Sequence, residues 1–411
     1  MKKIMMMAVA LVSAATAFGQ DNLVKQALKS KSNPAEAVKI LTPALTSSET
    51  VDKAAAWGAM SEIQYQFYSD AYEQMVQNQF KTEKTPIDTV GMYNGLIEAF
   101  KAAFKCDEYD IQPNEKGKVK PRYRSKNQSR LLPTRNTLID AGSQFYNVKN
   151  YEKAVDAWGM FVESADAPLF EGKVQKDSTY YLITGYASFA AYFSKNYDKA
   201  IAYATVALND EATKKDAINV IVSATKDQCK TKEDSVAYFN KLKELRAKLP
   251  NELSVLFAIN EYLSAPGRAA EKEAWCAEEV KKVPNDKYVW AFLGEAQMNQ
   301  QKYAEAVASF KKSFEVDPSF IEVEYNLGAS LVLQATAMKD QLSGATGRLS
   351  AADAEKVKAI YTEAKTHLEK IKEADPNREK VNWAYTLYQV YYGLGDAEKA
   401  AEIEKIIGGG Y

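Results

Sequence analysis

The chain of 411 residues is 46% hydrophobic and 26% charged, a composition that is typical of folded globular proteins and excludes a largely disordered chain. Its 53 basic and 54 acidic residues leave a formal net charge of −1, so no overall basic excess would attract nucleic acid or an anionic membrane. Any charged partner must therefore be recognised locally.

The first residues, MKKIMMMAVALVSAATAFGQ, predict a secretory signal peptide, because two lysines precede an apolar run that is followed by small residues. Cleavage after Ala17 and cleavage after Gly19 both fit, and we assign residues 1–19 to the leader. The apolar run is shorter than the ~20 residues that span a bilayer. Because the first cysteine, Cys106, lies far beyond either cut, we expect an exported protein in the periplasm or associated with an outer membrane, neither lipidated nor membrane-spanning.

Beyond the leader, apolar residues recur at helical spacing and β-branched alternation is almost absent, which predicts an all-α protein. Two apolar helical stretches, at 51–79 and 88–106, belong to an N-terminal helical module that we place at residues 20–115. We interpret this helix pair as a diverged copy of the repeats that follow it.

A strongly basic stretch, KGKVKPRYRSKNQSR at residues 116–130, joins this module to the next part of the chain; seven of its residues are Lys or Arg and none is acidic. One interpretation is a solvated helix start whose charge is partly neutralised by the acidic residues just before it. The other is a salt-sensitive contact site for an acidic protein or a lipid phosphate, made by Arg122, Arg124 and Lys126. Nucleic acid is not expected as a partner, because the chain is predicted to be exported.

The clearest repeat runs from Trp290 to Pro318, WAFLGEAQMNQQKYAEAVASFKKSFEVDP. It resembles the 34-residue tetratricopeptide repeat (TPR), a helix–turn–helix unit. The matching positions are Trp290, Leu293, Gly294, Tyr303, Ala306, Phe310 and Pro318. Large residues fill the space between helices, small ones let the helices approach, and the proline ends the second helix. Gln297 departs from the pattern, because the family usually has Tyr there.

Parts of the pattern return elsewhere. The recurring positions are Gly142, Phe145, Tyr151, Ala154 and Trp158; Tyr197, Ala200 and Ala207; Tyr325, Leu327, Gly328, Tyr361 and Ala364; and Leu387, Gly395 and Ala400. Between Lys214 and Pro284, two more helix pairs keep the repeat length but few signature residues. Because one repeat cannot bury its apolar face alone, stacked copies bury a continuous core. The resemblance implies an all-α, right-handed α-α superhelical solenoid of about seven TPR-like helix pairs at residues 116–408.

One repeat is interrupted, because Gly328 is separated from Tyr361 by far more residues than the repeat allows. The extra residues predict a helical hairpin at about 333–358. Its first helix continues to about Leu342, and its second starts with Ser350 as the N-cap. Loops absorb extra length at small cost, so the insertion is either tolerated or a contact surface for a partner.

The sequence lacks the residue patterns of a catalytic, metal or cofactor site. His367 is the only histidine, which excludes a histidine-rich metal site, and we expect it to be solvated or partly packed on an amphipathic helix. No glycine-rich phosphate loop or nucleophile motif occurs. Cys106, Cys229 and Cys276 are expected to be small packing residues, although one disulfide is not excluded. We therefore expect a protein that is not an enzyme and has no catalytic residues, metal or cofactor.

In TPR proteins the first helices of successive repeats line a concave surface where ligands usually bind, and the resemblance implies such a groove here. Residues three before the repeat glycine, and one and four after it, are expected to face the groove, with a further residue one turn earlier. The partner-binding candidates are Tyr288, Glu295, Glu322, Tyr325, Asn326, Tyr385, Gln389 and Tyr392. Tyrosine offers rigid contact area and a hydroxyl, which suits peptide or sugar recognition, but tyrosines also pack between helices.

These patterns predict a non-enzymatic TPR scaffold or adaptor in the bacterial cell envelope that binds a protein or peptide. It is not expected to clamp a terminal carboxylate as chaperone-binding TPR proteins do, because Asn326 is the only matching residue of that Lys/Arg/Asn set. The alternative is a glycan-binding helper of an outer-membrane uptake system, since one family of surface glycan-binding proteins is built on TPR helices. The missing lipidation cysteine and the lack of large loop insertions argue against the alternative.

Overall fold

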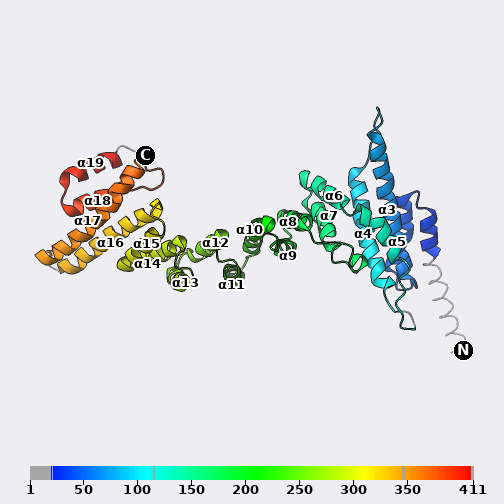
Figure 1. The fold of residues 1–411 in the computed structure, drawn as a ribbon, viewed down its shortest axis with the longest axis horizontal. Helices are drawn as coiled ribbons and strands as arrows, with labels where there is room; N and C mark the ends of the chain where they lie inside the picture. Colours follow the sequence, from blue (N-terminus) through cyan, green and yellow to red (C-terminus); the bar gives the residue numbers. More distant parts are fainter. Residues whose placement is uncertain (1–19, 21, 114–115, 345–347, 409–411) are drawn as a thin grey trace. The chain divides into compact units, whose positions relative to one another are not determined.

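The chain folds into helices and turns, and its described part contains no β-strand (Figure 1). The computed structural model describes residues 20, 22–113, 116–344 and 348–408. The predicted signal peptide therefore lies outside the described residues. Within them, no helix combines the length and the apolar character that a membrane crossing requires. The chain divides into two compact units, Met1–Asn240 and Lys241–Tyr411.

The first unit consists of helix pairs joined by turns. After helical residues at 22–29, its elements are α2 (Pro34–Thr46), α3 (Lys53–Asn78), α4 (Thr89–Asp110), α5 (Arg124–Leu131), the 3-10 turn η1 (Leu132–Thr134), α6 (Thr137–Asn147), α7 (Tyr151–Glu163), the 3-10 turn η2 (Pro168–Phe170), α8 (Ser178–Phe193), α9 (Tyr197–Ala207) and α10 (Glu211–Asp227). The pairs α3/α4, α6/α7 and α8/α9 pack tightly, and α10 packs against α8 and α9. Pro133 lies in η1, where proline cannot supply the amide that a continuous helix would need. The boundary between the units falls inside α11 (Lys232–Lys248).

The second unit continues with four helix pairs. They are α12 (Leu253–Leu263) and α13 (Ala269–Lys282), α14 (Lys287–Asn299) and α15 (Tyr303–Val316), α16 (Ile321–Ser343) and α17 (Ala351–Ala374), and α18 (Ala384–Leu394) and α19 (Ala397–Gly408). With α6/α7, α8/α9 and α10/α11, the described part of the chain has seven successive pairs after α5. The predicted all-α solenoid of TPR-like helix pairs is confirmed.

The turns inside four helix pairs share one backbone conformation. Each contains a residue in the left-handed region: Lys149 (φ 60°), Lys195 (φ 61°), Gln301 (φ 60°) and Gly395 (φ 74°). In all four turns the amide of the next residue donates to the carbonyl five residues earlier, at 2.9 Å. This hydrogen bond belongs to the Schellman motif, which ends a helix on a left-handed residue.

Gly395 of the last pair is a turn residue and not a packing position. A Cβ built on it would meet no atom within 4 Å, and glycine suits its left-handed backbone. The close approach to the preceding helix is made by Gly393, where an added Cβ would lie 2.6 Å from the ring of Tyr361.

The repeat glycines Gly294 and Gly328 are packing positions, as predicted. A Cβ on Gly294 would lie 2.8 Å from the ring of Phe310, and one on Gly328 would lie 2.9 Å from Leu368. Gln297, which replaces the usual Tyr, is buried and accepts a hydrogen bond of 2.6 Å from the hydroxyl of Ser309. The polar residue is therefore satisfied inside the core.

The interrupted repeat contains two long helices, α16 and α17. The hydroxyl of Ser350 accepts a hydrogen bond of 3.1 Å from the amide of Asp353, which confirms the predicted N-cap. Part of the predicted turn, residues 345–347, lies outside the described residues. On α17, His367 is largely buried and its Nδ1 lies 3.2 Å from the buried carboxylate of Glu324, so it is partly packed as predicted.

All three cysteines are free thiols, and the disulfide that the sequence left open is not formed. Cys106 and Cys276 are buried, whereas Cys229 is half-buried. Burial raises the pKa of the Cys106 and Cys276 thiols to about 12, so both stay protonated at neutral pH. Both are packing residues of the core.

Candidate functional site

Three tyrosines of α18 form a row of stacked rings on the second unit. The ring centroids of Tyr385 and Tyr388 are 6.5 Å apart, and those of Tyr388 and Tyr392 are 6.2 Å apart, with interplanar angles of 23° and 24°. Residues three and four apart share one face of a helix, which explains the row. Tyr385 and Tyr392 are 60% and 71% exposed, so these three residues, the tyrosine row, present aromatic surface to solvent.

Tyr325 of α16 adjoins the tyrosine row. Its hydroxyl lies 3.2 Å from the hydroxyl of Thr386, the residue next to Tyr385. Three further groove candidates lie on the same two helices: Glu322 is exposed, and Asn326 and Gln389 are half-buried. Six of the eight groove candidates thus lie on α16 and α18.

The remaining groove candidates, Tyr288 and Glu295 of α14, have structural partners. The Tyr288 ring packs edge-on against Phe257 and Phe320, with centroid distances of 5.2 and 5.5 Å. The carboxylate of Glu295 accepts a hydrogen bond of 2.8 Å from the ammonium group of the buried Lys272. Both side chains therefore connect α14 to neighbouring elements.

The basic stretch is held by carboxylates of the first unit. Arg122 donates two hydrogen bonds of 2.7 Å to Asp52, and Lys126 pairs with Glu62 at 2.6 Å. Arg124 likewise forms two hydrogen bonds, of 2.7 and 2.6 Å, with the buried Asp107. Each of the three proposed anion-contact residues already has an acidic partner, which favours the structural interpretation of this stretch over an anion site.

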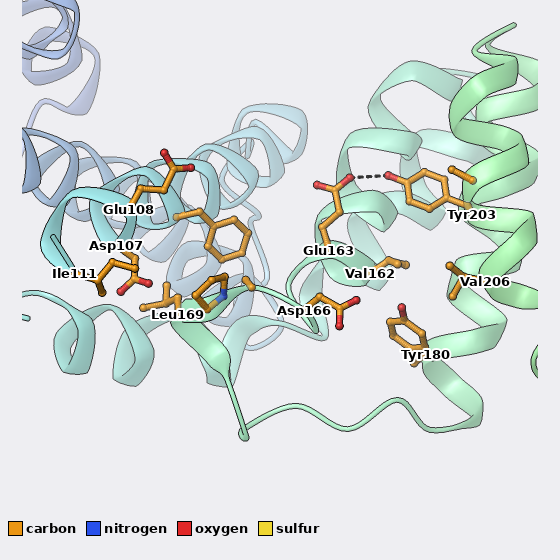
Figure 2. A pocket seen from close by; sticks show the side chains of 14 residues that line it. Asp107, Glu108, Ile111, Val162, Glu163, Asp166, Leu169, Tyr180, Tyr203 and Val206 are labelled. Atoms are coloured by element: carbon orange, nitrogen blue, oxygen red, sulfur yellow. Dashed lines mark hydrogen bonds between the residues drawn. The ribbon is translucent and has the colours of Figure 1, made fainter.

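A separate cleft of about 490 Å³ lies within the first unit. Figure 2 shows its side chains, which come from the end of α4, the end of α7 and the turn after it, the start of α8, and the end of α9. Its apolar lining consists of Phe104, Ile111, Val162, Ala167, Pro168, Leu169, Ala202 and Val206. Its polar lining consists of Asp107, Glu108, Glu163, Asp166, Tyr180 and Tyr203. The cleft is thus apolar with carboxylates, and no lysine or arginine lines it.

One hydrogen bond crosses part of this cleft. The hydroxyl of Tyr203 donates to the Glu163 carboxylate at 2.8 Å, as the dashed line in Figure 2 marks. Burial raises the pKa of the Tyr203 hydroxyl, and the nearby carboxylate adds to the effect. Tyr203 is therefore a neutral donor at physiological pH and not a general base.

The carboxylates of the cleft do not form a metal centre. Among the described residues, no group of three or more His, Cys, Asp or Glu side chains is placed to hold a metal ion. A cation that binds here would pair with one carboxylate and not with a cluster of them.

Tyr388 and the cleft were not predicted from the sequence. Tyr388 occupies the position of the repeat glycine, and its spacing from Tyr385 and Tyr392 is the only signal that could have added it to the row. The cleft joins residues from Phe104 to Val206 that share no motif, so no local pattern marks it.

Comparison with known proteins gives distant structural likenesses only. No protein-family model and no curated protein matches the sequence. The human IFIT1 dimer with m7Gppp-AAAA is 16% identical, with a TM-score of 0.35, over 83% of this chain and 71% of that one. The TPR2AB domain of yeast Sti1 in complex with pHSP90 is 14% identical, with a TM-score of 0.24, over 81% and 99% of the two chains. The TPR domain of P58(IPK) is 12% identical, with a TM-score of 0.24, over 79% and 100%.

Proposed function

We propose that this chain is an exported, non-enzymatic adaptor of the bacterial cell envelope that binds a protein or peptide partner through the tyrosine row of α18. The N-terminal leader pattern supports export, and the stacked helix pairs supply a rigid support for a binding face. The observation that carries the binding proposal is the exposure of Tyr385 and Tyr392 in a stacked row.

The contrast with a neighbouring tyrosine supports this interpretation. Tyr391 is buried, and its hydroxyl donates a hydrogen bond of 2.7 Å to Glu369. Within the described residues, the hydroxyls of Tyr385, Tyr388 and Tyr392 make no hydrogen bond to a protein group. Tyrosine is enriched among the side chains that anchor protein interfaces, where its ring is buried and its hydroxyl finds a partner.

A pull-down of the mature protein from envelope extracts, with identification of the recovered proteins by mass spectrometry, tests the proposal. The variant Tyr385→Ser/Tyr392→Ser should lose partners that the unmodified protein retains. Tyr72→Ser, which removes an exposed ring from α3, is the matched control and should retain them. Equal recovery of partner proteins by both variants would contradict the proposal that the tyrosine row binds them.

The second candidate function is glycan binding, which the same exposed rings favour because flat aromatic faces also stack on sugar rings. Retention of the protein on a polysaccharide gel, lost in Tyr385→Ser/Tyr392→Ser and kept in Tyr72→Ser, would favour this function. The N-terminal sequence of the protein recovered from the periplasm tests export and distinguishes a cut after Ala17 from a cut after Gly19.

A further inference from the structure

The cleft of the first unit combines an apolar surface with an excess of negative charge. Four carboxylates line it, from Asp107, Glu108, Glu163 and Asp166, and no basic side chain does. The last turns of α4, α7 and α9 also end beside the cleft. Because the C-terminal end of a helix carries a partial negative charge, three helix ends add to the attraction for a cation.

The four carboxylates differ in how firmly they are already paired. Asp107 is buried and held by two hydrogen bonds from Arg124, so it belongs to the fold. Glu108 pairs with Lys105 and Asp166 with Lys176, each at 2.7 Å, but these are exposed pairs of the kind that contribute little. A ligand cation can therefore replace either lysine at small cost.

Glu163 is the least satisfied of the four. Within the described residues it accepts a hydrogen bond from the Tyr203 hydroxyl and forms no ion pair, and Lys101 interacts with it through charge alone. Tyr203 occupies one carboxylate oxygen, Oε1, and leaves Oε2 for a further donor. The buried ring of Tyr180 already has the ammonium group of Lys176 5.4 Å from its centroid, which shows that a cation fits beside this ring.

From this geometry we propose that the cleft binds lysine or arginine side chains of a basic segment of a partner protein. The aliphatic stem of such a side chain packs on the apolar surface around Val162, Leu169 and Val206, and its charged head reaches Glu163. A second basic side chain reaches Glu108 or Asp166. A segment fits better than a single small cation, because the carboxylates are not gathered at one point.

This site lies in the first unit and the tyrosine row in the second, so the proposal does not depend on binding by the row. A basic segment would give the proposed adaptor a second, charge-selective contact. Failure of one site leaves the other testable with its own variants.

Fluorescence anisotropy of a short labelled peptide of alternating Ala and Arg, titrated with the mature protein, tests the proposal. The same peptide with citrulline in place of Arg keeps the shape but removes the charge, and we expect it to bind at least about tenfold more weakly. Raising the ionic strength from about 0.1 M to about 1 M shortens the Debye length from about 10 Å to about 3 Å and should weaken the binding of the Arg peptide.

Two variants separate the cleft from general electrostatics. Glu108→Gln/Glu163→Gln/Asp166→Asn removes three charges from the cleft, all on partly or fully exposed side chains, and should weaken the Arg peptide about tenfold. The control Glu211→Gln/Glu278→Gln/Glu315→Gln removes the same number of charges from exposed sites elsewhere and should change affinity less than about twofold.

Ala202→Phe tests the apolar surface with every carboxylate intact. Ala202 is exposed at the cleft, so the larger ring occupies the cleft without entering the core, and the Arg peptide should bind several-fold more weakly. Equal binding of the Arg and citrulline peptides, or equal losses in the cleft and control variants, overturns the proposal. A free diamine such as 1,5-diaminopentane that binds as tightly as the peptide also overturns it, in favour of a small-molecule site.

Discussion

Lys149 and Gly395 occupy equivalent turns in two helix pairs, and both take the left-handed conformation, with φ of 60° and 74°. Glycine adopts this conformation without strain, whereas a side chain such as lysine costs about 1–2 kcal/mol there. We therefore predict that Lys149→Gly raises the free energy of unfolding by about 1 kcal/mol, measured by urea denaturation.

The reverse change at the equivalent turn is the control. Gly395→Ala puts a Cβ into open space but into the strained backbone region, so it should lower the free energy of unfolding by about 1 kcal/mol. Loss of stability in Lys149→Gly would show that the lysine side chain, and not the backbone, controls this turn.

A second prediction compares two glycines in the interiors of α6 and α8. A Cβ on Gly142 would clash with the indole of Trp158, whose Nε1 donates a hydrogen bond of 3.1 Å to the carbonyl of Ile139. A Cβ on Gly185 would meet only Thr213, at an ordinary distance of 3.8 Å. Gly142→Ala should lower the free energy of unfolding by about 1–3 kcal/mol through overpacking.

Gly185→Ala is the matched control, because its Cβ has room. In a helix interior alanine is more favourable than glycine by about 1 kcal/mol. It should leave stability unchanged or raise it in the same thermal and urea experiments. If both alanine variants behave alike, close packing is not the reason for glycine at position 142.

The fold could be predicted from the sequence where a repeat position has one structural task. Gly294 and Gly328 each lie against a side chain of the second helix, Phe310 and Leu368, as the repeat pattern indicates. Gly393 has the same close-packing role against the ring of Tyr361, but the pattern could not predict it, because Tyr388 occupies the repeat-glycine position of the last pair.

The candidate sites could be predicted only in part, for a physical reason. Periodicity along one helix identifies residues that share a face, and it found Tyr385 and Tyr392 in this way. Exposure depends on what packs over that face, and the cleft depends on segments far apart in the chain, such as Glu163 and Tyr203. Neither the exposure of a side chain nor the cleft can be predicted from the spacing of residues along one helix.

The basic stretch yields a third prediction, because its arginine pairs differ in burial. Asp107 is 4% exposed and paired with Arg124, whereas Arg122, paired with Asp52, is 55% exposed. Arg124→Ala would leave a buried carboxylate without a cation and should lower the free energy of unfolding by about 3 kcal/mol. Because solvent screens the other pair, Arg122→Ala should cost only about 0.5–1 kcal/mol.

Urea denaturation at neutral pH measures both variants of the basic stretch. The double variant Arg124→Met/Asp107→Leu should recover much of the stability lost in Arg124→Ala, because it removes the uncompensated charge. Equal small losses in the two alanine variants would contradict a structural role for the Arg124 pair and reopen the anion-contact interpretation.

The Arg122 pair also gives a pH dependence with a definite sign. Hydrogen bonds from Arg122 hold the pKa of Asp52 below its ordinary value of 3.8. The pair therefore adds stability above pH 3.8, and this contribution is lost as the pH falls through the lower pKa of the folded state. The difference in stability between the unmodified protein and Arg122→Ala should be constant near neutral pH and shrink below pH 3.8.

Denaturation at a series of pH values checks this dependence, with Lys126→Ala measured in parallel. Lys126 pairs with Glu62 and not with Asp52, so Lys126→Ala should still lose the stability contributed by the Asp52 pair when the pH falls below 3.8. A difference for Arg122→Ala that widens as the solution becomes more acidic would contradict the linkage.

The last prediction asks whether the tyrosine row is needed by the fold. Tyr385 and Tyr392 are exposed and make no hydrogen bond to protein within the described residues, so Tyr385→Ser/Tyr392→Ser should change the free energy of unfolding by less than ~0.5 kcal/mol per site. Tyr391, one residue from Tyr392, is buried and bonded to Glu369, and Tyr391→Ala should cost ~3–5 kcal/mol. Urea denaturation measures both variants. If the exposed pair costs as much as Tyr391→Ala, the row stabilises the last helix pair, and loss of a partner in the double variant would then reflect unfolding. If it costs little, any loss of binding belongs to the contact itself.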